Sequence, residues 1–310
     1  MQGTVIKSSG SVYGVRAIDG TIVECRVKGN FRLKGIRSTN PVAVGDNVIF
    51  DMRDDGTAYI TEILERRNYI VRKASNLSKQ SHILAANLDV CFLIVTINHP
   101  VTATTFIDRF LAAAEAYRVP MVLVFNKTDL YDDADNEELD YLTALYGSIG
   151  YRCLRTSATD SKGIDELKEA MHGKVSLLAG NSGVGKSSLV NAIAPEIAAR
   201  VGEISRTHDT GMHTTTYTEM FEFAPGSYIV DTPGVKGFGT FDMEVEEISH
   251  YFVEFFELSK DCKYGNCTHT HEPGCAVLEA LEKGELAPSR YQSYLSMLED
   301  KDEGKYRASE

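Results

Sequence analysis

The sequence predicts a protein of three parts: an N-terminal β-barrel of the OB type, a central α/β domain built on a parallel sheet, and a C-terminal helical module that binds a metal ion. Three observations predict this fold class. Residues 1–70 read as short strands divided by glycine and aspartate turns, residues 71–240 alternate between strand and helix, and residues 241–310 are helical around a cluster of cysteines. These three ranges are the expected domains.

The composition is that of an ordinary folded protein. Of the 310 residues, 43% are hydrophobic and 25% are charged, which is enough apolar material for a core. No apolar run approaches the roughly 20 residues that a membrane helix needs, and no apolar leader follows Met1. We therefore expect a cytoplasmic protein that does not associate with membranes. We also expect it to be a monomer.

The charge is distributed unevenly along the chain. The formal net charge of −12 argues against a nucleic-acid partner, but residues 1–83 carry +5, residues 84–240 carry −8 and residues 241–310 carry −9. A basic barrel on an acidic body can still contact a polyanion through one face.

The predicted barrel contains five strands in under 70 residues, which favours an OB-fold. The expected strands are Thr4–Lys7, Tyr13–Ala17, Ile22–Val27, Asn47–Met52 and Tyr59–Leu64. Basic residues lie on or beside them, and they form either an RNA-binding face or an ordinary solvated surface: Arg26, Lys28, Arg32, Lys34, Arg37, Arg66 and Arg67. The candidate rings for base stacking are Tyr13, Phe31 and Phe50.

The central region alternates between strands and helices with short connections, as expected for a parallel sheet covered by helices. The expected strands are Asp89–Ile97, Met121–Phe125, Arg152–Leu154, Val175–Ala179 and Tyr228–Val230. The expected helices are Thr105–Tyr117, Glu137–Tyr146 and Ile164–Met171, with a further helix over Tyr291–Glu299 near the C-terminus.

A phosphate-binding loop, G-x-x-x-x-G-K-S, follows the strand Val175–Ala179 and opens a helix. Its glycines let successive backbone N–H groups point at phosphate oxygens. Lys186 is expected to reach the β- and γ-phosphates, and the Ser187 hydroxyl to bind Mg²⁺. The loop residues are Gly180, Asn181, Ser182, Gly183, Val184, Gly185, Lys186, Ser187 and Ser188. This pattern predicts a nucleoside triphosphate site.

Three further motifs predict guanine as the base and a switch at the γ-phosphate. The Asp129 carboxylate of Asn126-Lys127-Thr128-Asp129 can accept the N1–H and N2–H of guanine, while Asn126 links the loops. A backbone N–H of Ser157 or Ala158, after the next strand, can meet guanine O6. Asp231-Thr232-Pro233-Gly234 ends a strand, so the Asp231 carboxylate is expected to support Mg²⁺ and the Gly234 N–H to contact the γ-phosphate.

A metal site is expected near the C-terminus. Cys262, Cys267, His269 and Cys275 supply three thiolates and one imidazole, the ligand set of a closed structural zinc site. His271 is the alternative imidazole, and free thiols in a loop are the alternative without metal. Cys25, Cys91 and Cys153 lie in apolar or strand-like sequence and are expected in the core.

The order of these motifs resembles one family. Ordinary Ras-like GTPases carry the phosphate loop first, whereas here N-K-T-D and T-S-A precede the phosphate loop and D-T-P-G. That order, the basic barrel and the cysteine cluster resemble the RsgA (YjeQ/YloQ) family of circularly permuted GTPases. The resemblance implies GTP and GDP as substrate and product, Mg²⁺, one structural Zn²⁺, and the 30S ribosomal subunit with its 16S rRNA as partner. The family's G-R-H-T-T-T segment matches residues 211–216, with Met212 in place of the arginine.

The hydrolytic residues are expected in the same segment. Thr215 is the expected switch ligand of Mg²⁺, with Thr214 as the alternative, and Lys186 acts on the phosphates. Val235 occupies the place of the glutamine that orients water in Ras-like proteins, so slow intrinsic turnover is expected. His213 is the candidate to orient water, or else a structural histidine of the loop.

The leading hypothesis is a GTPase that docks on the immature 30S subunit, is stimulated by it, and hydrolyses GTP to leave. A rival is an RNA-binding assembly protein in which the nucleotide only fixes the shape, and a third is a GTPase acting on tRNA or a protein. The chain leaves Gly234 toward the C-terminal module, which predicts that a nucleotide-dependent shift there moves that module.

Overall fold

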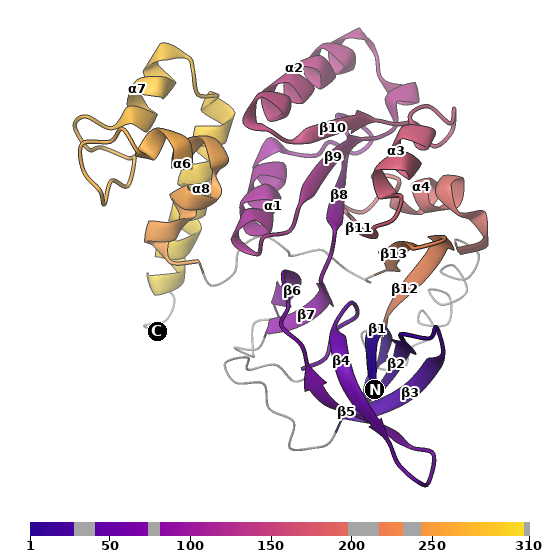
Figure 1. The fold of residues 1–310 in the computed structure, drawn as a ribbon. Coiled ribbons are helices and arrows are strands. Elements are labelled where there is room, and N and C mark those ends of the chain that lie inside the picture. The colour runs from indigo at the N-terminus through magenta and orange to yellow at the C-terminus, as the bar shows by residue number, and fades with distance from the viewer. Residues whose placement is uncertain (28–40, 74–80, 198–216, 232–242, 307–310) are drawn as a thin grey trace.

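The computed structural model describes residues 1–27, 41–73, 81–197, 217–231 and 243–306 (Figure 1). It contains a barrel at one end, a helix-covered sheet in the middle and a helical module beside that sheet. No helix in the described ranges combines the length and the apolar character that a membrane crossing requires.

The barrel has the predicted strands and the OB-type order. Its strands are β1 (Gln2–Ser9), β2 (Val12–Ala17), β3 (Ile22–Val27), β4 (Asn47–Met52) and β5 (Ala58–Ile63). They pair in the order β1-β2-β3-β5-β4, β4 returns to β1, and β3 and β5 run parallel. Side chains of β2 alternate between the two sides, so every second residue is buried in the barrel core. In β1 a bulge between Val5 and Lys7 interrupts the alternation, so Val5 lies in the barrel core and Ile6 in the core of the central domain.

The burial of side chains in the barrel contradicts the expectation that Tyr13 and Phe50 stack on RNA bases. Tyr13 is 2% exposed and Phe50 is fully buried, and both belong to the barrel core. They cannot stack on bases, so that assignment was wrong. Phe31, together with the predicted basic residues at 28, 32, 34 and 37, lies outside the described residues. Arg66 is also not an RNA-facing cation, because its guanidinium forms a buried bidentate pair with Asp46 at 2.6 Å.

A two-stranded sheet, which the sequence pattern did not predict, follows the barrel. It pairs β6 (Tyr69–Lys73) with β7 (Ser81–Ala86) in an antiparallel arrangement. Ala86 N–H donates to Val44 O at 2.9 Å, which connects this hairpin to the chain that leads into β4.

The central sheet is parallel over five strands. These are β8 (Val90–Val95), β9 (Met121–Phe125), β10 (Arg152–Arg155), β11 (Val175–Ala179) and β13 (Ser227–Asp231), in the order β10-β9-β8-β11-β13. β12 (Tyr217–Ala224) pairs antiparallel with β13. The five parallel strands fall on or next to the ranges expected from the sequence.

Helices cover both faces of this sheet. α1 (Thr104–Ala116) and α2 (Asp133–Ile149) pack on one face, against alternate residues of β8 such as Cys91 and Leu93. α3 (Ile164–Met171) and α4 (Lys186–Ile193) pack on the other, against Phe92 and Ile94. β8 is therefore buried on both sides, which explains its continuous apolar run.

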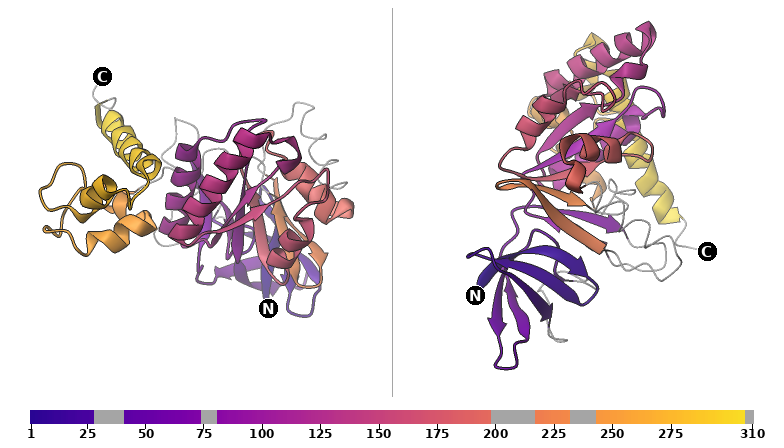
Figure 2. Two further views of the ribbon diagram at one scale, coloured as in Figure 1. Left: turned by 90° about the horizontal axis from the view of Figure 1, so that it is seen from above. Right: turned by 90° about the vertical axis from the view of Figure 1, so that its right-hand side faces the viewer.

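The barrel and the central sheet are joined by strand pairing. β1 pairs antiparallel with β12, with Lys7 opposite Glu219, Ser8 opposite Thr218 and Ser9 opposite Tyr217. The barrel therefore continues the central sheet into one eleven-stranded sheet. The right-hand view of Figure 2 shows the barrel next to the strands β12 and β13. Arg16 adds a side-chain contact, since it donates to the Tyr228 hydroxyl at 2.7 Å.

The C-terminal module consists of η2 (Val245–Tyr251), α6 (Val253–Ser259), α7 (Ala276–Lys283) and α8 (Pro288–Tyr306). It lies beside α1, away from the barrel (Figures 1 and 2). The predicted helix Tyr291–Glu299 is the middle of α8.

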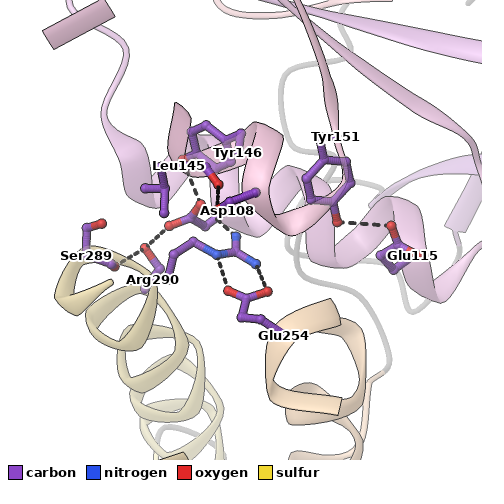
Figure 3. Close-up of polar contacts among 10 residues, drawn as sticks. Asp108, Glu115, Leu145, Tyr146, Tyr151, Glu254, Ser289 and Arg290 are labelled. Carbon is purple, nitrogen blue, oxygen red and sulfur yellow. Dashed lines mark hydrogen bonds and ion pairs between the residues drawn. The ribbon is translucent and has the colours of Figure 1, made fainter. Parts of the chain in front are cut away.

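A network of two buried charges and one half-buried charge links this module to α1 (Figure 3). Arg290 of α8 donates to Asp108 of α1 at 2.8 Å and to both oxygens of Glu254 of α6 at 2.6 and 3.0 Å. Asp108 also accepts from Tyr146 at 2.8 Å and from Ser293 at 2.6 Å. Although burial acts to lower it, the pKa of Arg290 is raised by its bonds to these carboxylates, so the cation is retained.

Candidate functional site

Four loops meet at one edge of the central sheet. Because β8, β9, β10 and β11 are parallel and adjacent, their carboxyl ends share an edge, which is where ligands bind in such sheets. The phosphate loop follows β11, the N-K-T-D motif follows β9 and the T-S-A motif follows β10. The fold therefore brings together motifs that are distant in sequence.

The phosphate loop has a backbone that requires glycine. Gly180 has a φ of 139°, and a methyl group there would lie 2.3 Å from Ile94 O. Gly185 has a φ of 97°, and a methyl group there would lie 2.4 Å from Asn126 Nδ2. Any larger residue at either position would push the loop away from its neighbours.

Lys186 begins α4 and bends back over the phosphate loop. Its ammonium donates to Gly180 O at 2.8 Å and to Asn181 O at 2.6 Å. Ser182, Gly183, Ser187 and Ser188 are exposed around it, whereas Val184 is buried below. The N-terminus of α4 and an ammonium group thus lie beside the same open loop, an arrangement that suits phosphate.

Asn126 connects three of these loops, since it belongs to the N-K-T-D loop and bonds to the phosphate loop and to the T-S-A loop. It is 1% exposed, and its side-chain amide donates to Val184 O of the phosphate loop at 2.9 Å. Its amide oxygen accepts from the Thr156 hydroxyl at 3.0 Å. Thr128 N–H adds a bond to Thr156 O at 3.2 Å. A displacement of one loop therefore disturbs the other two.

The remaining base-reading residues are placed at the surface of this assembly. Lys127 has a left-handed backbone and Asp129 is exposed within the short helix η1 (Thr128–Leu130). Ser157 N–H donates to Lys162 O at 2.9 Å. Since that N–H is engaged within its own turn, the N–H of Ala158 is the better candidate to meet a guanine oxygen.

Several predicted residues lie outside the part of the chain that the structure describes. These are Met212, His213, Thr214, Thr215, Gly234 and Val235. Asp231 ends β13, next to β11, but its side chain also lies outside that description.

Sequence reasoning missed Tyr131. Its hydroxyl accepts from Ile97 N–H at 2.8 Å and donates to Asn126 O at 2.6 Å. It follows the N-K-T-D motif by two residues, and the sequence offers no signal beyond that position.

The four predicted metal ligands converge. The ligand atoms of Cys262, Cys267, His269 and Cys275 all lie within 4.8 Å of one another. His269 Nδ1 is 3.7 Å from the sulfur of Cys262 and 3.4 Å from that of Cys275. A tetrahedral zinc ion with ordinary bond lengths separates such ligands by about 3.5–3.8 Å. The donor set and its spacing therefore fit zinc.

The surroundings of this cluster keep its ligands in place. The Tyr291 hydroxyl donates to His269 O at 2.9 Å, and the Tyr294 hydroxyl donates to Thr268 O at 2.6 Å. Burial lowers the pKa of His269, which favours the neutral imidazole that a metal needs. His271 is exposed, outside the cluster, and bonded to the Thr270 hydroxyl at 2.8 Å, so the structure does not support it as the alternative ligand.

Comparison with known proteins agrees with this geometry. The family model for the RsgA GTPase matches residues 63–241, and the model for the RsgA N-terminal domain matches residues 2–60. A protein of Phocaeicola vulgatus named small ribosomal subunit biogenesis GTPase RsgA is 64% identical over 309 residues, which cover 100% of both chains. The chain belongs to the RsgA GTPase family. It is accordingly a GTP hydrolase.

Other relatives share the full length and the fold. An RsgA of Porphyromonas gingivalis is 61% identical over 99% of both chains. The crystal structure of YjeQ from Thermotoga maritima matches with a TM-score of 0.78 and 36% identity, covering 96% of this chain and 97% of that one. YloQ, described as a circularly permuted GTPase, matches with a TM-score of 0.75 and 31% identity over 97% and 95% of the two chains. The permuted motif order of this RsgA family member is therefore also found in a solved neighbour.

Proposed function

We propose that this RsgA family member acts in the biogenesis of the small ribosomal subunit. In this proposal it binds the immature 30S subunit and its 16S rRNA, is stimulated there, and leaves after hydrolysing GTP to GDP and phosphate. The names of the full-length relatives support the role in small-subunit biogenesis. It works as a monomer in the cytoplasm.

The observation that carries the nucleotide site is the pair of bonds made by Asn126. Because this side chain links the phosphate loop to the base-reading loops, one ligand with a phosphate end and a base end can span them. Gly180–Ser188 then hold the phosphates, Asp129 accepts the guanine N–H groups, and the N–H of Ala158, beside Ser157, donates to guanine O6. Lys127 lies along the base, and Thr128 supports the turn.

The hydrolytic groups follow from the same placement. Ser187, Thr215 and Asp231 are the residues that would hold Mg²⁺, which stabilises negative charge on the phosphates when it is bound. Lys186 contributes a cation beside the same oxygens, Gly234 senses the γ-phosphate, and His213 orients water. Since Val235 cannot hydrogen-bond water, the partner is needed for fast turnover. Met212 removes a positive charge that the family has at this position.

The proposed metal is a structural zinc ion held by Cys262, Cys267, His269 and Cys275. The four protein ligands complete a tetrahedral set, so no position is left for a substrate. The zinc module and the barrel are the proposed contacts with the ribosomal subunit.

Asp129→Asn tests the nucleotide assignment. An asparagine amide cannot accept both guanine N–H groups, but it can donate to the 2-oxo group of xanthine. We expect affinity for GDP to fall by on the order of a hundredfold and affinity for XDP to rise, as measured with fluorescent nucleotides. Asp133→Asn, at the exposed start of α2, is the matched control. Unchanged GDP binding by Asp129→Asn would contradict the assignment.

Sedimentation tests the partner. Protein loaded with a non-hydrolysable GTP analogue is expected to pellet with 30S subunits more than protein loaded with GDP, and not with 50S subunits. Equal pelleting with both subunits in both nucleotide states would overturn the proposal.

A further inference from the structure

The loop of residues 96–102, between β8 and α1, is closed by two buried threonines. Thr102 N–H donates to Thr96 O at 3.0 Å, and Thr96 N–H donates to the Thr102 hydroxyl oxygen at 3.1 Å. The Thr96 hydroxyl donates to Pro100 O at 2.5 Å. The threonines are 1% and 7% exposed, so these bonds are protected from water and fix the shape of the loop.

The tip of the 96–102 loop lies between the base-reading turn and the phosphate loop. Lys127 donates its ammonium to His99 O at 2.5 Å. On the other side, a methyl group placed on Gly183 would lie in van der Waals contact with Pro100, 3.5 Å from its Cδ. His99, Pro100 and Val101 are exposed, and the Val101 side chain is 70% exposed.

Tyr131 fixes the same loop from the base side. Its hydroxyl accepts from Ile97 N–H and donates to the backbone carbonyl of Asn126, so one oxygen connects the 96–102 loop to the start of N-K-T-D. Burial raises the pKa of Tyr131 to about 12, so the hydroxyl retains its proton and the bond to Asn126 O.

We propose that Tyr131 and the 96–102 loop position Lys127 against the purine base of the bound nucleotide. The carbonyl of His99 holds the ammonium, so the aliphatic part of Lys127 is stretched along the edge of the site. Tyr131 fixes the distance between that carbonyl and the backbone from which Lys127 extends. This inference rests on the proposed nucleotide site and adds a positioning residue to it.

The position of these residues determines which step they affect. GTP and GDP share the base and differ only at the far end of the phosphates. Loss of the Tyr131 hydroxyl therefore lowers the affinity for GTP and for GDP by the same factor. It does not slow hydrolysis of the bound GTP.

The test uses Tyr131→Phe in the full chain. We expect the dissociation rates of labelled GDP and of a labelled GTP analogue to rise together, by about tenfold for two lost hydrogen bonds. KM for GTP is expected to rise while kcat stays unchanged. Tyr141→Phe, on the exposed side of α2, is the control and changes neither rate.

Thr96→Val provides an independent route to the same effect, because it removes the bond to Pro100 O and leaves Tyr131 intact. The double variant is expected to lose less than the sum of the two single effects, since both act on one loop. If Tyr131→Phe does not fold, as judged by its melting temperature, Thr96→Val alone decides. Unchanged dissociation rates, or a lower kcat at unchanged KM, would overturn the inference. If the wild-type chain binds no guanine nucleotide, the proposed function itself fails.

Discussion

Within the described residues, the junction of the barrel with the central sheet and the junction of the C-terminal module with α1 are built differently. The barrel joins the central sheet through the main-chain pairing of β1 with β12. The C-terminal module packs on α1 through a shared apolar core and adds a charge network of the buried Asp108 and Arg290 with the half-buried Glu254. Main-chain pairing survives most side-chain changes. A buried charge network depends on each of its members, because any charge left without its partner is costly.

This difference bears on how nucleotide state reaches the C-terminal module. The expectation that a shift at Asp231–Gly234 moves that module stays a prediction. Within the described residues, the module is fixed to α1 through Asp108, on the side of the sheet that also carries α2. Movement of the module would therefore have to open the charge network or carry α1 with it.

Loss of a metal ligand should have the largest effect on stability. We expect that effect in the C-terminal module and not in the barrel. Cys275→Ser removes a ligand from a segment with little core of its own, so we expect the module to lose several kcal/mol of local stability. Amide hydrogen exchange should accelerate around residues 262–275 and remain unchanged in the barrel. Cys153→Ser, on β10 and outside the cluster, is the matched control. Equal exchange in Cys275→Ser and wild type would contradict the metal-dependent fold.

Loss of the charge network between α1 and the C-terminal module is expected to have the second largest effect on stability. Arg290→Met leaves the buried Asp108 and the half-buried Glu254 without their cation, which should lower the free energy of unfolding by about 3–5 kcal/mol. Urea unfolding measures this loss. Lys283→Met, which removes an exposed pair with Glu279, should leave the midpoint unchanged. If Arg290→Met leaves the free energy of unfolding unchanged, apolar packing alone attaches the module to α1.

The main-chain junction requires a backbone change to break it. β1 is paired with β12 on one side and with β2 on the other, so a proline at Ser8 removes a donor directed at one of them. We expect Ser8→Pro to cost about 1–3 kcal/mol more than Ser8→Ala, which keeps the N–H. Thermal unfolding of the pair measures the difference. Equal stability of the two variants would contradict a stabilising role of the main-chain bond at Ser8.

The smallest expected effect is a pH dependence confined to the charge junction. Burial, with Asp108 nearby, raises the pKa of Tyr146 above its ordinary value of 10.0. The unfolded chain therefore loses this proton at a lower pH than the folded chain, so the contribution to stability is complete below pH 10 and falls as the pH rises further. Tyr146→Phe should show a flatter decline between pH 9 and 11. Parallel curves for the two proteins would exclude this contribution.

Much of the fold follows from local sequence, because periodicity reports which face of a strand or helix is buried. β3, β4, β9, β11 and α3 were predicted at their observed bounds. The pairing of β1 with β12 could not be predicted in this way, since it joins residues about 210 positions apart and no local pattern records it. The hairpin of β6 and β7 was missed as well.

The residues of the candidate site also fall into two groups, those that the sequence predicts and those that it does not. The chemistry of phosphate and guanine requires particular residue types, namely the glycines and the lysine of the phosphate loop and the N-K-T-D motif. The sequence therefore predicts these residues. Tyr13 and Phe50 were misassigned because aromatic residues serve a barrel core as readily as a stacking face. Tyr131 and the 96–102 loop bond to backbone groups, the Tyr131 hydroxyl to Ile97 N–H and Asn126 O and Lys127 to His99 O. Neither the chemistry of phosphate nor that of guanine requires these residue types, so no motif marks them.

The most direct test of the account is steady-state GTP hydrolysis by the wild-type protein, with and without 30S subunits, and with 50S subunits and tRNA as controls. We expect slow turnover by the protein alone, because Val235 stands where Ras-like GTPases have the glutamine that orients water, and strong stimulation by 30S subunits only. Tight GTP binding with no stimulation by 30S subunits would contradict it, and would indicate an assembly protein whose nucleotide only fixes its shape.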